Sequence, residues 1–138
     1  MPENSALVLP QEVIEVPGIK ALGPYSQAVR ANGFLFVSGQ PGLDPATGIA
    51  AESFEQQARQ AFQNLAAVLE AGGSNMSLVV NTTVSVANMA DFPFVNQLFL
   101  EYFSEKPPAR MTQQVPLPRG LLISIGCVAL VSPAPPQG

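Results

Sequence analysis

Among the polar side chains of this sequence, Arg110 stands in the most restrictive context. It lies in a β-prone run, residues 107–115, that opens with Pro107-Pro108 and is followed by Pro116, in a chain with only six Lys and Arg residues. A guanidinium in such a run must reach a wet rim, a protein carboxylate or an anionic ligand, because an unpaired buried charge is costly. Its planar fork fits a carboxylate well. Pairing with one of the ten acidic residues is the simplest interpretation, and a ligand carboxylate is the functional alternative.

Further polar side chains that could serve a site fall near the ends of expected strands. Each alone has a structural explanation, since a tyrosine can be a core ring with a wet hydroxyl, a serine can form a turn and a threonine suits a strand. For the asparagine, a rim or capping amide is the simplest interpretation. These side chains are Tyr25, Ser38, Asn96, Thr112, Gln114 and Ser124.

The composition narrows the available chemistry. The chain has no His and a single Cys, Cys127, which removes the usual zinc sites, Ser-His-Asp and Cys-His catalytic groups, and an internal disulfide. We therefore expect no metal and no cofactor. A net charge of −4 argues against a nucleic-acid partner, because binding phosphates needs a basic surface.

The 138 residues are 47% hydrophobic and only 12% charged, against roughly 25% charged in an average soluble domain. This composition predicts one domain, residues 1–131, part of whose surface is covered by further subunits. The Pro-rich tail, residues 132–138, is expected to be disordered. No apolar run approaches the roughly 20 residues of a membrane span, and no charged leader precedes the domain, so a cytoplasmic location is predicted.

Local signals predict a hairpin and two helices. Asn32-Gly33 between two β-prone runs indicates a tight hairpin. Ser53 with Gln56 three residues later indicates a helix start, and apolar residues then recur at steps of three and four until Gly72-Gly73. Asp91 is expected to cap a second helix with a large aromatic face.

Strands account for the remaining patterned runs. Residues 11–16 form a short candidate strand or a loose edge, and residues 107–115 form the Arg110 strand. In residues 78–87, the row containing Val80, Val84 and Val86 is expected to face the helices. In residues 121–131, one face carries Ile123, Ile125, Cys127 and Ala129, and the other carries Leu122, Ser124, Gly126, Val128 and Leu130.

The resulting order β, β, β, α, β, α, β, β predicts an α+β sandwich, with one mixed sheet and both helices on one of its faces. The other face lacks a cover within the chain. We therefore expect it to pack against other copies, as a barrel-like ring of subunits.

Several motifs together resemble the RidA/YjgF family of reactive-intermediate (enamine/imine) deaminases across residues 19–131. They appear in that family's order and spacing: Gly23-Pro24-Tyr25-Ser26-Gln27-Ala28, Phe36-Val37-Ser38-Gly39-Gln40, Asp44-Pro45-Ala46-Thr47-Gly48, Gln57-Ala58, Asn64-Leu65, Val95-Asn96 and Pro108-Ala109-Arg110. The resemblance implies a chorismate-mutase-like fold of the bacillary type and a homotrimer with a central barrel and sites between subunits.

The same resemblance implies roles for individual residues and a reaction. Arg110 corresponds to the arginine that grips the substrate carboxylate, and Thr112 falls where many members carry cysteine. The implied reaction is hydrolysis of small 2-imino acids, the tautomers of 2-aminoacrylate- or 2-aminocrotonate-type enamines, to 2-keto acids and ammonia. The implied catalytic residues are Arg110, Tyr25 and Ser124, and the implied binding residues are Arg110, Ser38, Gly39, Asn96 and Thr112.

One position departs from the family pattern. Where many deaminating members carry Glu-Ile-Glu in the last strand, this chain has Ser124-Ile125-Gly126, if the Pro116–Gly120 turn is one residue shorter. A serine can hydrogen-bond a water but cannot act as its base near neutral pH. Two alternatives therefore stay open: a trimeric module that binds small carboxylates with weak or no turnover, and a pathway enzyme acting on a larger enamine.

Overall fold

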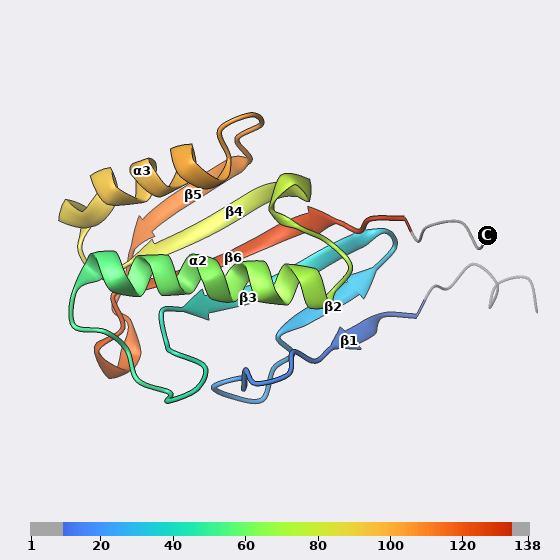
Figure 1. Cartoon of the computed structure of the whole chain (residues 1–138), viewed down its shortest axis with the longest axis horizontal. Coiled ribbons are helices and arrows are strands. Elements are labelled where there is room, and N and C mark those ends of the chain that lie inside the picture. Colours follow the sequence, from blue (N-terminus) through green and yellow to red (C-terminus); the bar gives the residue numbers. More distant parts are fainter. Residues whose placement is uncertain (1–9, 134–138) are drawn as a thin grey trace, which may run out of the picture.

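The computed structural model describes residues 10–133, which form one six-stranded sheet with two long helices on one side (Figure 1). The strand order is β1-β2-β3-β6-β4-β5, and all neighbours are antiparallel except the parallel pair β4–β5. The strands are β1 (Glu12–Ile14), β2 (Ala28–Ala31), β3 (Phe34–Pro41), β4 (Val79–Val86), β5 (Ala109–Gln114) and β6 (Ile123–Leu130). The helices are α2 (Phe54–Ala71) and α3 (Phe92–Tyr102), with short 3₁₀ turns at Met76–Leu78, Met89–Asp91 and Pro118–Gly120. The predicted α+β architecture and element order are confirmed.

The hairpin turn and the start of the first helix form as their local residues predict. Asn32 and Gly33 have φ of 53° and 83°, the positive values that a tight hairpin turn requires, and Ala31 pairs with Phe34 across it. Ser53 caps α2, because its side chain accepts a hydrogen bond from the Gln56 N–H at 3.2 Å.

Other local expectations need correction. Asp91 makes no capping hydrogen bond to α3; Asn88 instead caps the preceding 3₁₀ turn, accepting from the Ala90 N–H at 2.9 Å. In β4, Val79 is buried and Val80 exposed, the reverse of the prediction, because an irregularity in the pairing with β6 shifts the alternation by one residue. The strand candidate at residues 11–16 shortens to β1 at the sheet edge.

The core lies between the sheet and the helices, and β6 stands at its centre. The predicted inner row of β6 is buried as expected: Ile123, Ile125, Cys127 and Ala129. Phe62 of α2 packs against rings of α3 and its C-terminal turn, with centroid distances of 5.9 Å to Phe99 and 5.0 Å to Tyr102. Helix α2 therefore bridges the sheet and α3.

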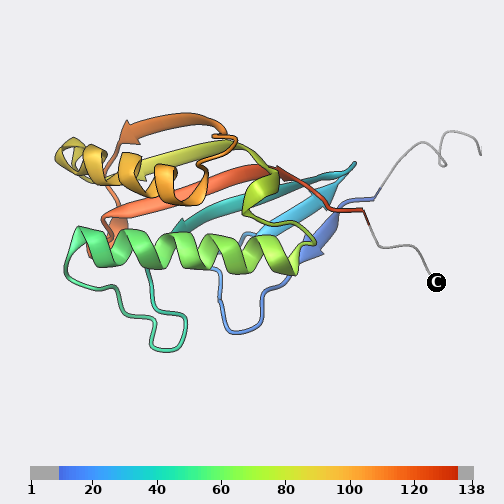
Figure 2. The same cartoon turned by 45° about the horizontal axis from the view of Figure 1, so that its top comes forward.

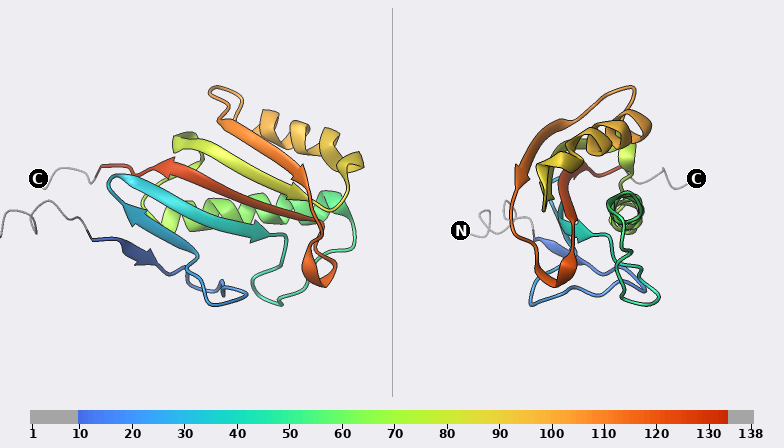
Figure 3. Two further views of the ribbon diagram at one scale, coloured as in Figure 1. Left: turned by 180° about the vertical axis from the view of Figure 1, so that it is seen from behind. Right: turned by 90° about the vertical axis from the view of Figure 1, so that its left-hand side faces the viewer.

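The opposite face of the sheet has no cover within residues 10–133, as the views from behind and from the end show (Figure 3). Large apolar side chains alternate along its strands with buried ones and remain exposed: Val13, Phe34, Phe36, Val80, Met111 and Leu130. We call this surface the open face.

Two further expectations concern the C-terminal tail and a possible membrane span. The predicted disordered tail lies mostly outside it, since only Ser132 and Pro133 are described, and the Ser132 N–H donates to the Gly73 carbonyl at 2.8 Å. Within residues 10–133, neither helix has both the length and the apolar content that a bilayer crossing requires.

Candidate functional site

Arg110 lies on β5, at the edge of the sheet, and faces α3. Its Nη2 donates to the Asn96 Oδ1 at 2.8 Å. Its guanidinium carbon stands 5.0 Å from the centre of the Phe92 ring and 4.7 Å from that of Phe99. Phe92, Asn96 and Phe99 follow one another at steps of four and three, so they share one face of the helix. That spacing, combined with Arg110, is the sequence signal that could have placed the two rings in the site.

These contacts overturn the simplest interpretation of Arg110. Within residues 10–133, the ion pairs join Arg30 to Glu12 and Arg59 to Glu101, and Arg110 takes part in neither. Its partners are a neutral amide oxygen and two aromatic faces, which orient the guanidinium without neutralising it. Most of its five N–H donors are left for a ligand, and a carboxylate is the anion whose geometry matches them.

Thr112 follows Arg110 on the same face of β5. Its Oγ1 is buried and has no hydrogen-bond partner within the described residues. Buried hydroxyls usually find a partner, so this group is either satisfied by something bound or costs stability. The resemblance places Thr112 beside the ligand, and its unsatisfied hydroxyl agrees with that position.

A β-bulge shapes the second part of the site. The pairing of β3 with β6 joins Val37 to Cys127 and then Gln40 to Ile125, which leaves Ser38 and Gly39 without paired residues on β6. A side chain at Gly39 would collide with the Ser124 Oγ. The absence of a side chain at Gly39 thus leaves room for the Ser124 hydroxyl, and the bulge aims Ser38 and Gly39 at the cavity beside Ser124.

Two hydroxyls near this bulge have defined hydrogen-bond roles. The Ser38 Oγ donates to the Ser26 carbonyl at 2.7 Å, so its lone pairs are available to accept from a water or ligand. The Tyr25 hydroxyl accepts from the Leu22 N–H at 3.2 Å, so its own proton is available to donate. The loop that carries Tyr25 thus presents a donor, and β3 presents an acceptor.

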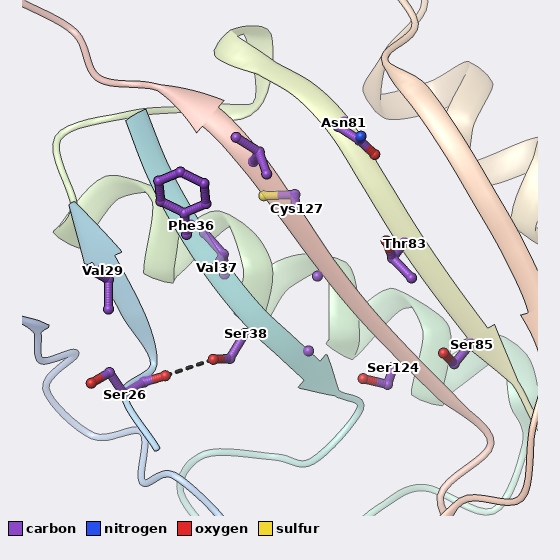
Figure 4. A pocket seen from close by; sticks show the side chains of 13 residues that line it. Ser26, Val29, Phe36, Val37, Ser38, Asn81, Thr83, Ser85, Ser124 and Cys127 are labelled. Atoms are coloured by element: carbon purple, nitrogen blue, oxygen red, sulfur yellow. Dashed lines mark hydrogen bonds between the residues drawn. The ribbon is translucent and has the colours of Figure 1, made fainter. Parts of the chain in front are cut away.

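The cavity beside the bulge lies on the open face and measures about 500 Å³. Figure 4 shows its side chains in front of the sheet with the helix behind. Sequence reasoning identified Ser38, Gly39 and Ser124 but missed the polar row of β4, Asn81, Thr83 and Ser85, which also lines the cavity. Alternation indicated that row, but not that β4 would lie next to β6.

Cys127 is the only cysteine, and it is buried. Burial raises the pKa of its thiol to about 12, because the thiolate is poorly solvated there. Near neutral pH it is therefore a protonated, unreactive group rather than a nucleophile.

The predicted site residues fall into two groups that do not meet within one chain. Arg110, Asn96 and Thr112 form the first group, at the β5 edge and on the helix side of the sheet. Ser38, Gly39 and Ser124 form the second, on the open face, with Tyr25 in the adjoining loop. Strand β4 separates β5 from β6, so a small ligand held by Arg110 cannot also contact Ser124 of the same chain.

The fold and these two groups define a class of protein. It is an α+β sandwich with a polar cavity on the open face of its sheet and, at the edge of the sheet, an arginine whose guanidinium can bind a carboxylate. Residues 17–131 match the family described as Endoribonuclease L-PSP, and the chain belongs to this family. Relatives from Arabidopsis thaliana, Mus musculus and Homo sapiens carry deaminase names, which confirms the resemblance to the RidA/YjgF deaminases.

The first of these relatives is Reactive Intermediate Deaminase A, a chloroplast protein of Arabidopsis thaliana, 47% identical over 111 residues. The match covers 79% of this chain and 59% of the plant protein. The 2-iminobutanoate/2-iminopropanoate deaminase of Mus musculus is 43% identical over 115 residues, 82% of this chain and 85% of the mouse protein. Among solved structures, E. coli TdcF with bound serine has a TM-score of 0.81 at 29% identity, covering 88% of this chain and 99% of that one.

Removing the Asn96 amide tests whether it orients Arg110. We expect Asn96→Ala to weaken binding of 2-oxobutanoate about fivefold, because the loss of one hydrogen bond to a charged group costs about 1 kcal/mol at an exposed site. Isothermal titration calorimetry measures the change. Gln97→Ala, on the same helix but outside the site, is the matched control and should bind like the unaltered chain. Equal affinities for all three proteins would show that Asn96 has no such role.

Proposed function

We propose that this chain is a homotrimeric deaminase that hydrolyses small 2-imino acids to 2-keto acids and ammonia. The observation that carries the proposal is the environment of Arg110, whose charge is oriented by Asn96 and two rings but not neutralised by a carboxylate within residues 10–133. The names of the Arabidopsis and mouse relatives support the same reaction, and the serine bound to TdcF is a small carboxylate-bearing ligand.

The chemistry needs little acid or base strength, because an imine carbon is already electrophilic. The enamine first tautomerises to the imine, and water then adds to the imine carbon. The resulting carbon bears both a hydroxyl and an amine; a proton moves to the nitrogen, the hydroxyl loses its proton, the C–N bond breaks, and ammonia and the keto acid remain. The protein contributes mainly by holding the carboxylate and orienting the water.

Each site residue has one role in this scheme. Arg110 holds the carboxylate with its unused N–H groups, next to Thr112. Tyr25 donates its free hydroxyl proton toward the departing nitrogen, and Ser38 accepts a hydrogen bond from the attacking water. Ser124 lies against Gly39 and can hold the same water, but it cannot remove its proton near neutral pH.

The homotrimer explains how the two groups of site residues meet. The edge of one subunit, with Arg110, lies against the open face of the next, where Ser38 and Ser124 line the cavity. Six exposed apolar side chains on the open face supply the burial that such an interface needs. A substrate then lies between subunits, and each trimer has three equivalent sites.

A second function is favoured by one observation, Ser124 in place of the family's glutamate. Without a base for the water, the site would bind small carboxylates and release them unchanged. Binding of 2-oxobutanoate without any acceleration of imine hydrolysis would identify this carboxylate-binding module.

Endoribonuclease activity, which the family description names, fits poorly with a net charge of −4. The cytoplasmic location stays a prediction, since the Arabidopsis relative is a chloroplast protein.

Ammonia release from 2-iminobutanoate, generated in situ by an amino acid oxidase, tests the deaminase and the role of Arg110. We expect the unaltered protein to accelerate release and Arg110→Ala to lower kcat/KM about 100-fold, since the carboxylate loses a charged, two-pronged partner worth about 3 kcal/mol. Arg59→Ala is the control, because Arg59 also faces an aromatic ring but is paired with Glu101. An unaltered protein without activity, or an Arg110→Ala variant with full activity, would refute the proposal.

The water-handling role of position 124 is tested by restoring a carboxylate. Ser124→Glu should raise kcat about 10-fold or more, because a carboxylate next to the water can accept its proton. Ser124→Gln has nearly the same size without the base and should give no increase. The role is wrong if glutamate leaves the rate unchanged or lowers it, or if glutamine raises it equally.

The assembly is tested by charging the open face. The unaltered protein should have about three times the monomer mass in size-exclusion chromatography with light scattering. Phe36→Asp should dissociate it and abolish ammonia release, because a carboxylate in an apolar interface has no partner. Ile49→Asp, which is equally drastic but lies in the loop before α2, away from the open face and the β5 edge, should leave the trimer intact. A monomeric unaltered protein, or an intact Phe36→Asp trimer, contradicts the assembly.

A further inference from the structure

Three loops gather at one end of the sheet (Figure 2). Residues of these loops line a second cavity, the loop-end cavity. It measures about 440 Å³, and Gly39 lines both it and the open-face cavity. The side chains that matter for its chemistry are Lys20, Leu22, Tyr25, Leu43, Asp44 and Arg119. A ligand whose reactive carbon lies near Gly39 and Tyr25 can therefore extend into this cavity.

The loop-end cavity has a cationic rim. Lys20 and Arg119 both line it, and neither makes an ion pair or a side-chain hydrogen bond within residues 10–133. The one carboxylate in its lining is Asp44, whose Oδ1 already accepts from the Ala46 N–H at 2.8 Å. The rim thus carries two cations against one engaged carboxylate, in a chain whose net charge is −4.

Arg119 lies in a turn that requires an unfavourable backbone conformation of this residue. Its φ of 59° and ψ of 31° are left-handed, a conformation that costs a non-glycine residue about 1 kcal/mol. Gln57 of α2 anchors the end of this turn, because its Oε1 accepts a hydrogen bond from the Leu122 N–H at 2.9 Å. Across the cavity, the Leu22 N–H holds the Tyr25 hydroxyl at 3.2 Å. The backbone turn that carries Arg119 and the loop that carries Tyr25 therefore each have a hydrogen bond that anchors them at the edge of the cavity.

The cavity also has apolar walls, which include Leu22 and Leu43. The volume of about 440 Å³ is in the range of about 300–1,000 Å³ typical of small-molecule sites. A three- or four-carbon imino acid held beside Gly39 and at Arg110 of the neighbouring copy leaves most of this cavity unfilled. Methylene groups suit the walls, and a terminal anion suits the two cations at the rim.

We propose that the loop-end cavity binds a second carboxylate at the end of the substrate's side chain, so that dicarboxylic 2-imino acids are preferred over monocarboxylic ones. This inference rests on the proposed deaminase function and adds specificity to it. One carboxylate lies at Arg110 of the neighbouring copy in the proposed trimer. The imine carbon lies beside Gly39 and Tyr25, and the second carboxylate lies between Lys20 and Arg119.

Stable keto-acid products serve as probes in calorimetric titrations of the assembled protein. We expect 2-oxoglutarate to bind about 10-fold more tightly than 2-oxobutanoate. The ratio of the two affinities should fall about fivefold in Lys20→Gln and in Arg119→Gly, because each removes one partner of the second carboxylate. Glycine accepts the positive φ at position 119 and so removes the cation without straining the turn.

Lys106→Gln is the matched control, because Lys106 is a cation outside both cavities, and it should keep the ratio of the unaltered protein. The inference is overturned if the unaltered protein shows no preference for 2-oxoglutarate, or if both variants keep it. Intact hydrolysis of 2-iminobutanoate alongside such a result would leave the deaminase function standing. If neither keto acid binds and no imine is hydrolysed, the proposed function fails and the inference fails with it.

Discussion

The constraint on which the molecule depends is that its two long helices cover only one face of a six-stranded sheet. Every strand must then divide its side chains between a covered row and an open row, since successive residues point to opposite faces. In β6 the covered row is apolar, while the open row contains Ser124 and Gly126 and leaves a polar gap. The same arrangement produces both a dry core and an open face that carries exposed apolar side chains.

The elements that the sequence predicted correctly are those encoded by neighbouring residues. Asn32-Gly33 can only make its turn with positive φ, and the Ser53 cap needs a partner three residues away. The β-bulges were missed because they depend on pairing between strands. Val80 has the side chain of a core residue, and its exposure follows from its register against β6, which local alternation cannot specify.

The site shows the same division between local and long-range information. The position of Arg110 between proline breaks indicated a constrained cation, but its partner could not be identified from ten candidate acids. The structure brings Asn96 and two rings to it because β5 follows α3 and packs beside it. Arg30 and Arg59 instead pair with Glu12 and Glu101. Hydrogen bonds and charge from these two arginines lower the pKa of the two glutamates. An arginine with only neutral partners keeps its full attraction for an anion.

The hydroxyls around the bulge limit how this site can accelerate hydrolysis. The Ser38 proton is engaged with the Ser26 carbonyl, and Ser124 offers a neutral hydroxyl that is too weakly acidic to ionise near neutral pH, so neither group can take a proton from water. Both can still accept hydrogen bonds from it and fix its direction of approach. Placing reactants in the right geometry is worth up to about 7–11 kcal/mol, whereas a general base contributes about 10²–10⁴-fold in rate. For an electrophile as reactive as an imine, a site that keeps the first contribution and lacks the second can therefore still be a catalyst.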